Sequence, residues 1–277
     1  MRITSSSNGL RNVGTFCAKE RTKVVNITSP VSAKLAKGML VTCKLCKKEK
    51  DLMKSHIIPE FIYKSLYDEK HRFHEISADK NKKNGLLQKG VREHLLCNDC
   101  EHHFSKYETY ASLVLNGGYS LKVRNEGRLI HLEGVEYSKF KLFALSILWR
   151  AGVSNLGLFS QVKLGLHEEI LRKMLLNNDP GEEHIYPFIL SPIVQENSVQ
   201  EALIVQPTWT RLGNHYAYRF VFGGMAWVFV VSSHRAPKEV IVASISKEGK
   251  ITMLPWALSD MKFIVHMAQE LTASGKL

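Results

Sequence analysis

Cys43-Lys44-Leu45-Cys46 opens, and Leu95-Leu96-Cys97-Asn98-Asp99-Cys100-Glu101-His102-His103 closes, the stretch of sequence with the clearest pattern. Each Cys-x-x-Cys pair can present two thiolates, and four thiolates complete a tetrahedral zinc site. The fifth cysteine, Cys17, stands alone. Paired cysteines in a chain without a recognisable secretory signal favour metal over disulfides. We therefore predict structural zinc bound by Cys43, Cys46, Cys97 and Cys100.

Composition and charge narrow the class of protein. The 277 residues are 44% hydrophobic and 23% charged, as in ordinary globular proteins, and 38 Lys and Arg against 26 Asp and Glu give a net charge of +12. Residues 1–110 hold 21 of the basic and 12 of the acidic side chains, so the cysteine-containing half is the more basic one. This imbalance favours DNA as a partner, although a merely soluble basic surface would look the same. The longest apolar run, residues 225–231, is too short to cross a bilayer, so we expect no membrane span and a cytoplasmic protein.

Hydrophobic periodicity predicts an α+β fold in three segments. Residues 1–38 are basic and rich in Ser, Thr and Asn, and we expect them to be disordered. Residues 39–118 predict a small zinc domain with strands at 52–56, 73–76, 86–88 and 94–96, a helix at 60–67, and a helix from Asn98 to about Asn116. Residues 119–277 predict a mixed domain with helices at 140–153 and 162–176, a mostly antiparallel sheet and a closing helix at 261–271. The strands of that sheet are expected at 186–193, 202–206, 216–222, 226–232, 240–246 and 251–254, with Gly223-Gly224 as a hairpin turn.

Between the cysteine pairs lies Lys54-Ser55-His56-Ile57-Ile58-Pro59, which contains a candidate general base. Histidine suits that role because its pKa lies near neutrality, and cleavage of a phosphodiester needs a base for water and a cation for the developing charge. His56 lies ten residues after Cys46, and Glu101 directly follows Cys100. A zinc site would therefore hold both side chains rigidly, with Glu101 as a candidate ligand of a second cation.

The segment from Cys43 to Glu108 resembles the zinc-stapled HNH endonucleases of the ββα-metal type, over about a quarter of the chain. The variants Ser-His-Ile-Ile-Pro-Glu-Phe and Cys-Glu…Phe-Ser-Lys-Tyr-Glu look like a bacterial HNH-like subfamily. The resemblance implies a nuclease that cleaves DNA with Mg²⁺ or Mn²⁺, with His56 on the general-base position and Glu101 on the cation-ligand position. It also assigns structural zinc to the four paired cysteines. Proteins of this architecture are associated with phage defence, so the resemblance suggests that context.

The chain departs from the family pattern at one position that is expected to bind the catalytic cation. The family has Asp or His immediately before the base, where this sequence has Ser55, and a hydroxyl is a weaker cation ligand than a carboxylate. Ser55, His102, His103, Asp99 and Glu108 remain candidates for the missing contact. The alternative function is therefore a non-catalytic, zinc-stapled nucleic-acid-binding protein that has lost a cation ligand.

Each candidate also has a structural interpretation. His56 could instead hydrogen-bond the cysteine knuckle, Glu101 is an acid favoured in a first helical turn, and His102 could simply face solvent. Basic side chains near the motifs are candidates for phosphate contact: Lys47, Lys48, Lys50, Lys54, Lys82, Lys83, Lys89 and Arg92. The 119–277 segment is expected to choose a substrate or bind a protein partner.

Overall fold

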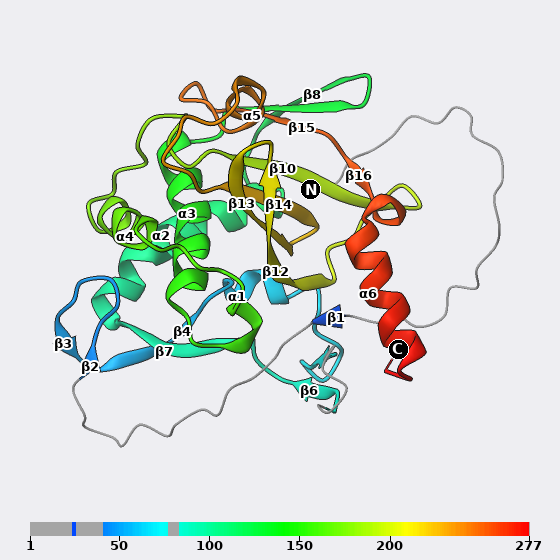
Figure 1. Cartoon of the computed structure of the whole chain (residues 1–277), viewed down its shortest axis with the longest axis horizontal. Coiled ribbons are helices and arrows are strands. Elements are labelled where there is room, and N and C mark those ends of the chain that lie inside the picture. Colours follow the sequence, from blue (N-terminus) through cyan, green and yellow to red (C-terminus); the bar gives the residue numbers. More distant parts are fainter. Residues whose placement is uncertain (1–23, 26–40, 77–82, 277) are drawn as a thin grey trace.

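The structure is a computed structural model that describes residues 24–25, 41–76 and 83–276 (Figure 1). It is an α+β protein, as predicted, whose largest sheet is mostly antiparallel. The order of strands in that sheet is β11 (Ser198–Val199), β10 (Phe188–Gln195), β14 (Met225–Val230), β13 (His215–Phe222), β12 (Leu203–Leu212), β1 (Val24–Val25), β5 (Phe73–Glu75) and β6 (Gly85–Leu87), with β16 (Trp256–Ala257) beside β10. The parallel pairs are β1 with β12, β1 with β5, and β10 with β16.

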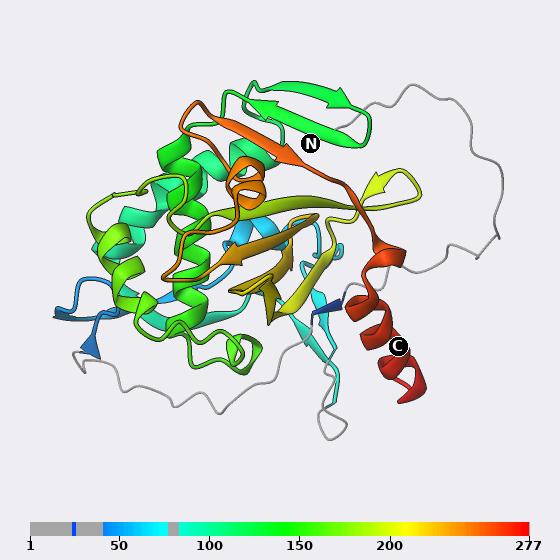
Figure 2. The ribbon, with the colours of Figure 1, turned by 45° about the horizontal axis from the view of Figure 1, so that its top comes forward.

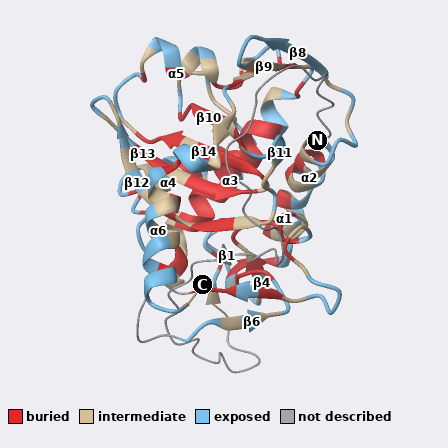
Figure 3. Ribbon diagram, turned by 90° about the vertical axis from the view of Figure 1, so that its right-hand side faces the viewer, coloured by how far each residue is buried: buried red, intermediate tan, exposed pale blue. Residues whose placement is uncertain are grey.

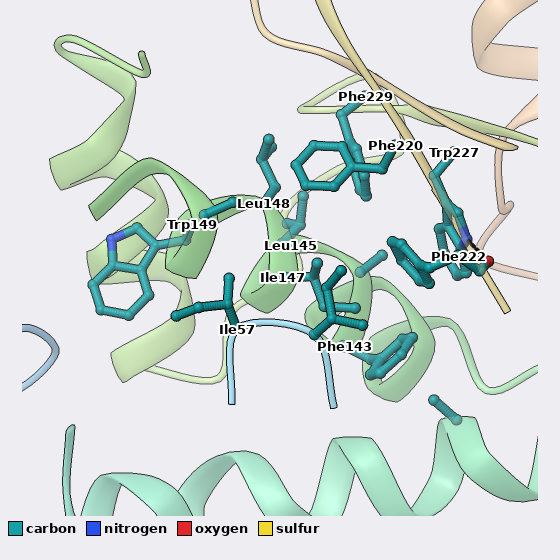
Figure 4. Close-up of a cluster of buried hydrophobic side chains, with 14 of the residues drawn as sticks. Ile57, Phe143, Leu145, Ile147, Leu148, Trp149, Phe220, Phe222, Trp227 and Phe229 are labelled. Carbon is teal, nitrogen blue, oxygen red and sulfur yellow. Dashed lines mark hydrogen bonds between the residues drawn. The ribbon is translucent and has the colours of Figure 1, made fainter. Parts of the chain in front are cut away.

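A buried helix, α3 (Tyr137–Val153), lies at the centre of the molecule. Its sequence is apolar on nearly every face, which is the pattern of a helix surrounded by protein rather than of an amphipathic surface helix. The helices α2 (Asn98–Leu115) and α4 (His167–Leu176) pack against it, and the sheet covers another side. Figure 4 shows its side chains pointing to opposite sides, with Trp149 on one side and Phe143 towards Trp227 and Phe222 on the other.

Alternation along the strands of the large sheet gives it two buried faces. Phe220, Phe229 and Trp227 join the core around α3, while their neighbours Val221 and Ala226 face the helix α6 (Lys262–Ala273). A second small helix, α5 (Lys238–Ala243), packs on the same outer face as α6. Figures 2 and 3 show the resulting layers, with the buried residues of α3 and the strands at the centre.

A ββα unit carries the cysteine pairs. The short strands β2 (Val41–Thr42) and β3 (Glu49–Lys50) form the first knuckle, and β4 (Leu52–His56) pairs antiparallel with β7 (Arg92–Cys97), which leads directly into α2. The helix α1 (Glu60–Tyr63) follows β4 and begins after Pro59. The hydrophobic core is continuous from this unit to the large sheet, because Cys43, Ile57, Trp149 and Phe229 belong to one buried cluster.

Several predicted elements differ from the structure. In place of the strand expected at residues 240–246, the chain forms the helix α5, which follows Pro237 and ends at Ala243 despite its β-branched residues. The helix expected at 60–67 ends at Tyr63, and the one expected at 162–176 begins only at His167, since Gly165 has a φ of +55° and interrupts it. A 3-10 turn, η1 (Gly157–Phe159), precedes it.

The C-terminal segment also contains more elements than predicted. After residue 118 the described chain has four α-helices rather than two with a closing third: α3, α4, α5 and α6. A hairpin of β8 (Lys122–Glu126) and β9 (Leu129–Glu133), which β15 (Lys250–Met253) extends, was not predicted. All five residues of β8 are exposed, so no hydrophobic alternation marks that strand.

Other predictions hold or lie outside the described residues. Gly223 and Gly224 have φ of +59° and +74° and form the predicted hairpin turn between β13 and β14. Apart from Val24–Val25, the 1–38 segment lies outside the described residues, as do residues 77–82. A short 3-10 turn, η2 (Leu258–Asp260), precedes α6. No helix among the described residues combines the length and apolar character needed to traverse a bilayer.

Candidate metal centre and adjoining acid–histidine cluster

The four paired cysteines converge, as their spacing predicts. The Sγ atoms of Cys43, Cys46, Cys97 and Cys100 all lie within 4.8 Å of one another, and those of Cys46 and Cys97 are 3.9 Å apart. Tetrahedral zinc with bonds of about 2.3 Å places its sulfur ligands about 3.8 Å apart. All four are free cysteines in the structure. The site can therefore hold a metal ion, and its geometry is consistent with structural zinc.

Local backbone geometry builds this centre. The N–H of Cys43 donates to the carbonyl of Lys48 at 2.9 Å, and Lys47 closes the turn with a φ of +60°. Cys97 ends β7 and Cys100 lies in the first turn of α2, so a strand-to-helix junction brings the second pair together. The N–H of Cys97 donates to Sγ of Cys43 at 3.3 Å, which joins the two knuckles.

The close approach of the sulfurs perturbs their acidity. A hydrogen bond from Cys100 lowers the pKa of the Cys43 thiol to about 4, and the same contact raises the pKa of Cys100 well above its usual range. Burial raises the pKa of Cys97. A bound cation would favour the thiolate form of all four cysteines.

His56 lies at the end of β4, one residue after the strand position that faces Glu93 of β7. Its Nε2 lies 2.8 Å from Oε2 of Glu60, the first residue of α1. Tyr67 donates from its hydroxyl to the other carboxylate oxygen of Glu60 at 2.6 Å. Burial lowers the pKa of His56, while the charge of Glu60 opposes that shift. The imidazole is thus kept mainly neutral at physiological pH, as a general base must be.

Two carboxylates of α2 border the same region. Glu101 and Glu108 are seven residues apart, which places them two turns apart on one face of the helix. Burial raises the pKa of Glu101, and contact with the Ser55 hydroxyl and the charge of Arg150 oppose that shift. Glu108 lies 2.8 Å from the guanidinium of Arg150.

Arg150 of α3 connects these groups. Its side chain is 1% exposed, and its Nη1 donates to the carbonyl oxygen of His56 at 2.7 Å while it pairs with Glu108. The guanidinium also lies 5.4 Å from the ring of Phe104 and donates to Ser146 on its own helix. A single buried cation therefore fixes the end of β4 against α2.

The cluster is marked by titratable side chains gathered in a half-buried region. The ion pairs of His56 with Glu60 and of Glu108 with Arg150 lie beside Glu101, whose carboxylate contacts the Ser55 hydroxyl. Titratable groups with shifted pKa values that gather in one place are candidates for a functional site.

The other predicted residues occupy different positions. Ser55 is fully buried, and its hydroxyl accepts a hydrogen bond from the N–H of Leu96 at 3.1 Å, so it supports Glu101 and the strand pair. His102 is exposed, with Nδ1 3.0 Å from the carbonyl of Asn98, and His103 contacts the carbonyl of Leu175. Within the ranges that the structure covers, the four cysteines are the only group of three or more His, Cys, Asp or Glu ligands close enough to share an ion.

Most of the predicted basic residues lie on the surface. Lys47, Lys48, Lys54, Lys83 and Lys89 are exposed, whereas Lys50 pairs with Asp99 and Lys82 lies outside the described residues. Sequence reasoning overlooked Glu60 and Arg150. Glu60 has a usable signal, since it lies four residues after His56, but Arg150 comes from a position 94 residues away and has none.

Comparison with family models, with curated proteins and with solved structures gave no match. The candidate function of the site is therefore argued from its own residues.

Proposed function

We propose that the chain is a divalent-cation-dependent nuclease that hydrolyses phosphodiester bonds in DNA, with a structural zinc at its four cysteines. The observation that supports this most is the half-buried histidine His56, with its lowered pKa and its Glu60 partner, in the same ββα unit as Glu101 and a centre that can hold a metal ion. A neutral histidine and a carboxylate are groups that metal-assisted phosphodiester hydrolysis can use.

In this proposal each side chain has a distinct task. His56 takes the proton of the attacking water, and Glu60 holds the imidazole through the 2.8 Å contact at Nε2. A bound Mg²⁺ or Mn²⁺ supplies stabilisation of the charge that develops on the phosphate and leaving oxygen. Glu101 is the candidate ligand for that cation, whereas Glu108 on the same helix is paired with Arg150. One carboxylate can suffice, because Mg²⁺ commonly keeps several waters and takes further oxygens from substrate phosphates.

In the proposed enzyme, the metal–thiolate centre has a structural role. Four thiolates leave no open coordination position, so an ion held there positions groups rather than activating water. It joins β7 and α2, the elements that carry Arg92 and Glu101, to the knuckle next to β4. The exposed lysines of that unit would attract a DNA backbone.

Cleavage of supercoiled plasmid tests the proposal. Wild-type protein is compared with His56→Ala and Glu101→Gln, each with Mg²⁺, with Mn²⁺ and without added cation, after zinc content has been matched. His74→Ala serves as the control, since His74 is an exposed histidine of β5. We expect cation-dependent nicking by the wild type and the control. Loss of a general base lowers the rate by about 10²- to 10⁴-fold, so His56→Ala should be nearly inactive.

Two outcomes would contradict the nuclease. Equal nicking by His56→Ala and His74→Ala would mean that the activity does not use this site. Failure of every variant to nick DNA, with DNA binding retained, would favour the alternative of a non-catalytic, zinc-stapled nucleic-acid-binding protein. That alternative has one specific observation in its favour: the Ser55 hydroxyl is already hydrogen-bonded to the Leu96 N–H and is no free cation ligand.

A further inference from the structure

A second candidate site lies on the large sheet, built by residues other than those of the acid–histidine cluster. It is a pocket of about 480 Å³ lined by residues of the segment after η1, of α4 and of the sheet: Gln161, Lys163, Leu164, His167, Trp209, Tyr216, Tyr218 and Val231. This volume falls in the range of small-molecule sites. We name it the aromatic pocket.

Strand register explains the aromatic pocket. Trp209 of β12 pairs with Tyr218 of β13, and Arg211 pairs with Tyr216, so these four side chains share one face of the sheet. Further along the same face, Phe220 and Phe229 are buried in the core around α3. At the end of β12 and β13 that carries Trp209 and Tyr216, the core around α3 no longer covers the sheet. The rings of Trp209 and Tyr216 therefore reach solvent.

The floor of the pocket is held in place by hydrogen bonds. The hydroxyl of Tyr218 accepts from the N–H of Lys163 at 3.2 Å and donates to the carbonyl of the same residue at 2.5 Å. Gln206 donates to the carbonyl of Gly157 at 3.2 Å, and His167 lies 2.9 Å through Nδ1 from the hydroxyl of Tyr186. The pocket is therefore formed without a ligand, which reduces the entropy lost on binding.

Two aromatic side chains in the pocket are unusually accessible. Trp209 is 57% exposed and Tyr216 is 52% exposed, and their ring centroids are 6.3 Å apart. Of the other three tryptophans, Trp149 and Trp227 are fully buried and Trp256 is half-buried. Adjacent exposed aromatic rings on rigid strands form a stacking surface and commonly mark a binding site.

The charged side chains around the pocket indicate which class of ligand it can bind. None of the eight lining residues is acidic, and Lys163 is exposed at its edge. The guanidinium of Arg211 lies 4.9 Å from the ring centre of Tyr216 and adds a second cation. A ligand that complements both features has a flat aromatic ring and a negative charge.

We propose that the aromatic pocket binds a nucleotide, with the base stacked on Trp209 or Tyr216 and the phosphate near Lys163 and Arg211. The nucleotide could be free or be an unpaired residue of a single-stranded nucleic acid, because both present a base and a phosphate. The proposal does not depend on cleavage at His56, since binding here involves none of those residues.

Binding measurements without added divalent cation separate this proposal from the nuclease. The probes are a fluorescein-labelled oligothymidylate, an abasic oligonucleotide of the same length, and the mononucleotides AMP and dTMP as competitors and in direct calorimetry. The variants are Trp209→Ala, Trp209→Phe and Lys163→Gln. Lys250→Gln is the control, because Lys250 is an exposed lysine of β15 away from the pocket. Circular dichroism confirms that each variant is folded.

We expect Trp209→Ala to weaken binding by about 5- to 150-fold, the range of a single base stack, and Trp209→Phe to retain most of the affinity. Binding of the oligothymidylate but not of mononucleotides would assign the pocket to single strands, and the reverse would assign it to free nucleotides. The proposal is overturned if no probe binds, if the abasic strand binds as tightly as oligothymidylate, or if Trp209→Ala binds like Lys250→Gln.

Discussion

Arg150 is the residue that connects the two halves of the candidate site. Its guanidinium is buried, bonds the backbone carbonyl of His56 and pairs with Glu108. A buried charge is tolerated only when paired and hydrogen-bonded, so the arrangement depends on all three groups being present.

Arg150→Met should destabilise the protein by about 2–3 kcal/mol, below the usual range for a broken buried pair because Glu108 is 26% exposed. The variant keeps the apolar stem but leaves the Glu108 carboxylate without its cation. Urea unfolding at constant zinc measures the effect. The double variant with Glu108→Gln should recover part of the loss. If Arg150→Met and the double variant are equally stable, the ion pair contributes little to the free energy of unfolding.

The pH dependence of the proposed nuclease follows from His56. Burial lowers its pKa below 6.5, and the base is active when deprotonated, so activity should rise with pH along an acidic limb whose midpoint lies below 6.5. The Glu60 carboxylate favours the protonated imidazole and raises this pKa. Glu60→Gln should therefore move the acidic limb of the kcat/KM profile to lower pH. A limb that stays in place, or moves to higher pH, would contradict this electrostatic role for Glu60.

At the scale of elements, the candidate metal centre joins short pieces of chain. β2 and β3 are two residues long, and besides the cysteines they are held to β7 and α2 by the Lys44 N–H, which donates to the Leu95 carbonyl, and by the Lys50–Asp99 ion pair. Such short pieces have too little apolar surface to be stable alone, which is the usual reason for a structural metal.

Cys46→Ser should lower metal content and open this unit locally. We expect faster hydrogen exchange at the N–H groups of Cys43, Lys44 and Cys97, with exchange in β12 and β13 unchanged, because those two strands are held by their own ladder of hydrogen bonds. Cys17→Ser is the matched control and should keep one zinc per chain. Normal zinc content in Cys46→Ser, or exchange that rises equally everywhere, would contradict a local metal clamp.

At the scale of the whole molecule, the buried core does not divide at residue 118. Phe104 of α2 packs edge-on against Trp149 of α3, and Phe61 lies beside Phe143. Both contacts belong to the one cluster that also contains strand residues of the large sheet. The predicted zinc domain thus buries apolar surface against the segment that follows it.

A fragment of residues 39–118 is therefore expected to fold poorly even with zinc, because removal of α3 takes away the partners of Phe104 and Phe61. The measurement is a thermal melt by circular dichroism with dye binding to exposed apolar surface. The full chain under the same conditions is the reference. A sharp melt of the fragment without dye binding would support the independent domain that the sequence predicts.

The sequence alone predicted the features that depend on short spacing. Each Cys-x-x-Cys pair, the strand with His56 and the helices α2, α3 and α6 follow from motifs or periodic patterns within about twenty residues. That the two pairs would meet across 54 residues came from the chemistry of a four-thiolate site. The sequence failed at α5, which forms over a β-branched run, and at β8, whose residues have no buried face.

Only the tertiary structure could reveal the buried Arg150 at the candidate site, the continuous core and the aromatic pocket. Arg150 and His56 are 94 residues apart, and the pocket joins β12 and β13 to the segment after η1. Contacts of this kind arise from how helices and sheets pack, and packing depends on the shapes of many side chains at once rather than on any local pattern. The cysteines thus predict where a metal can bind, whereas the environment of His56 is a product of the whole fold.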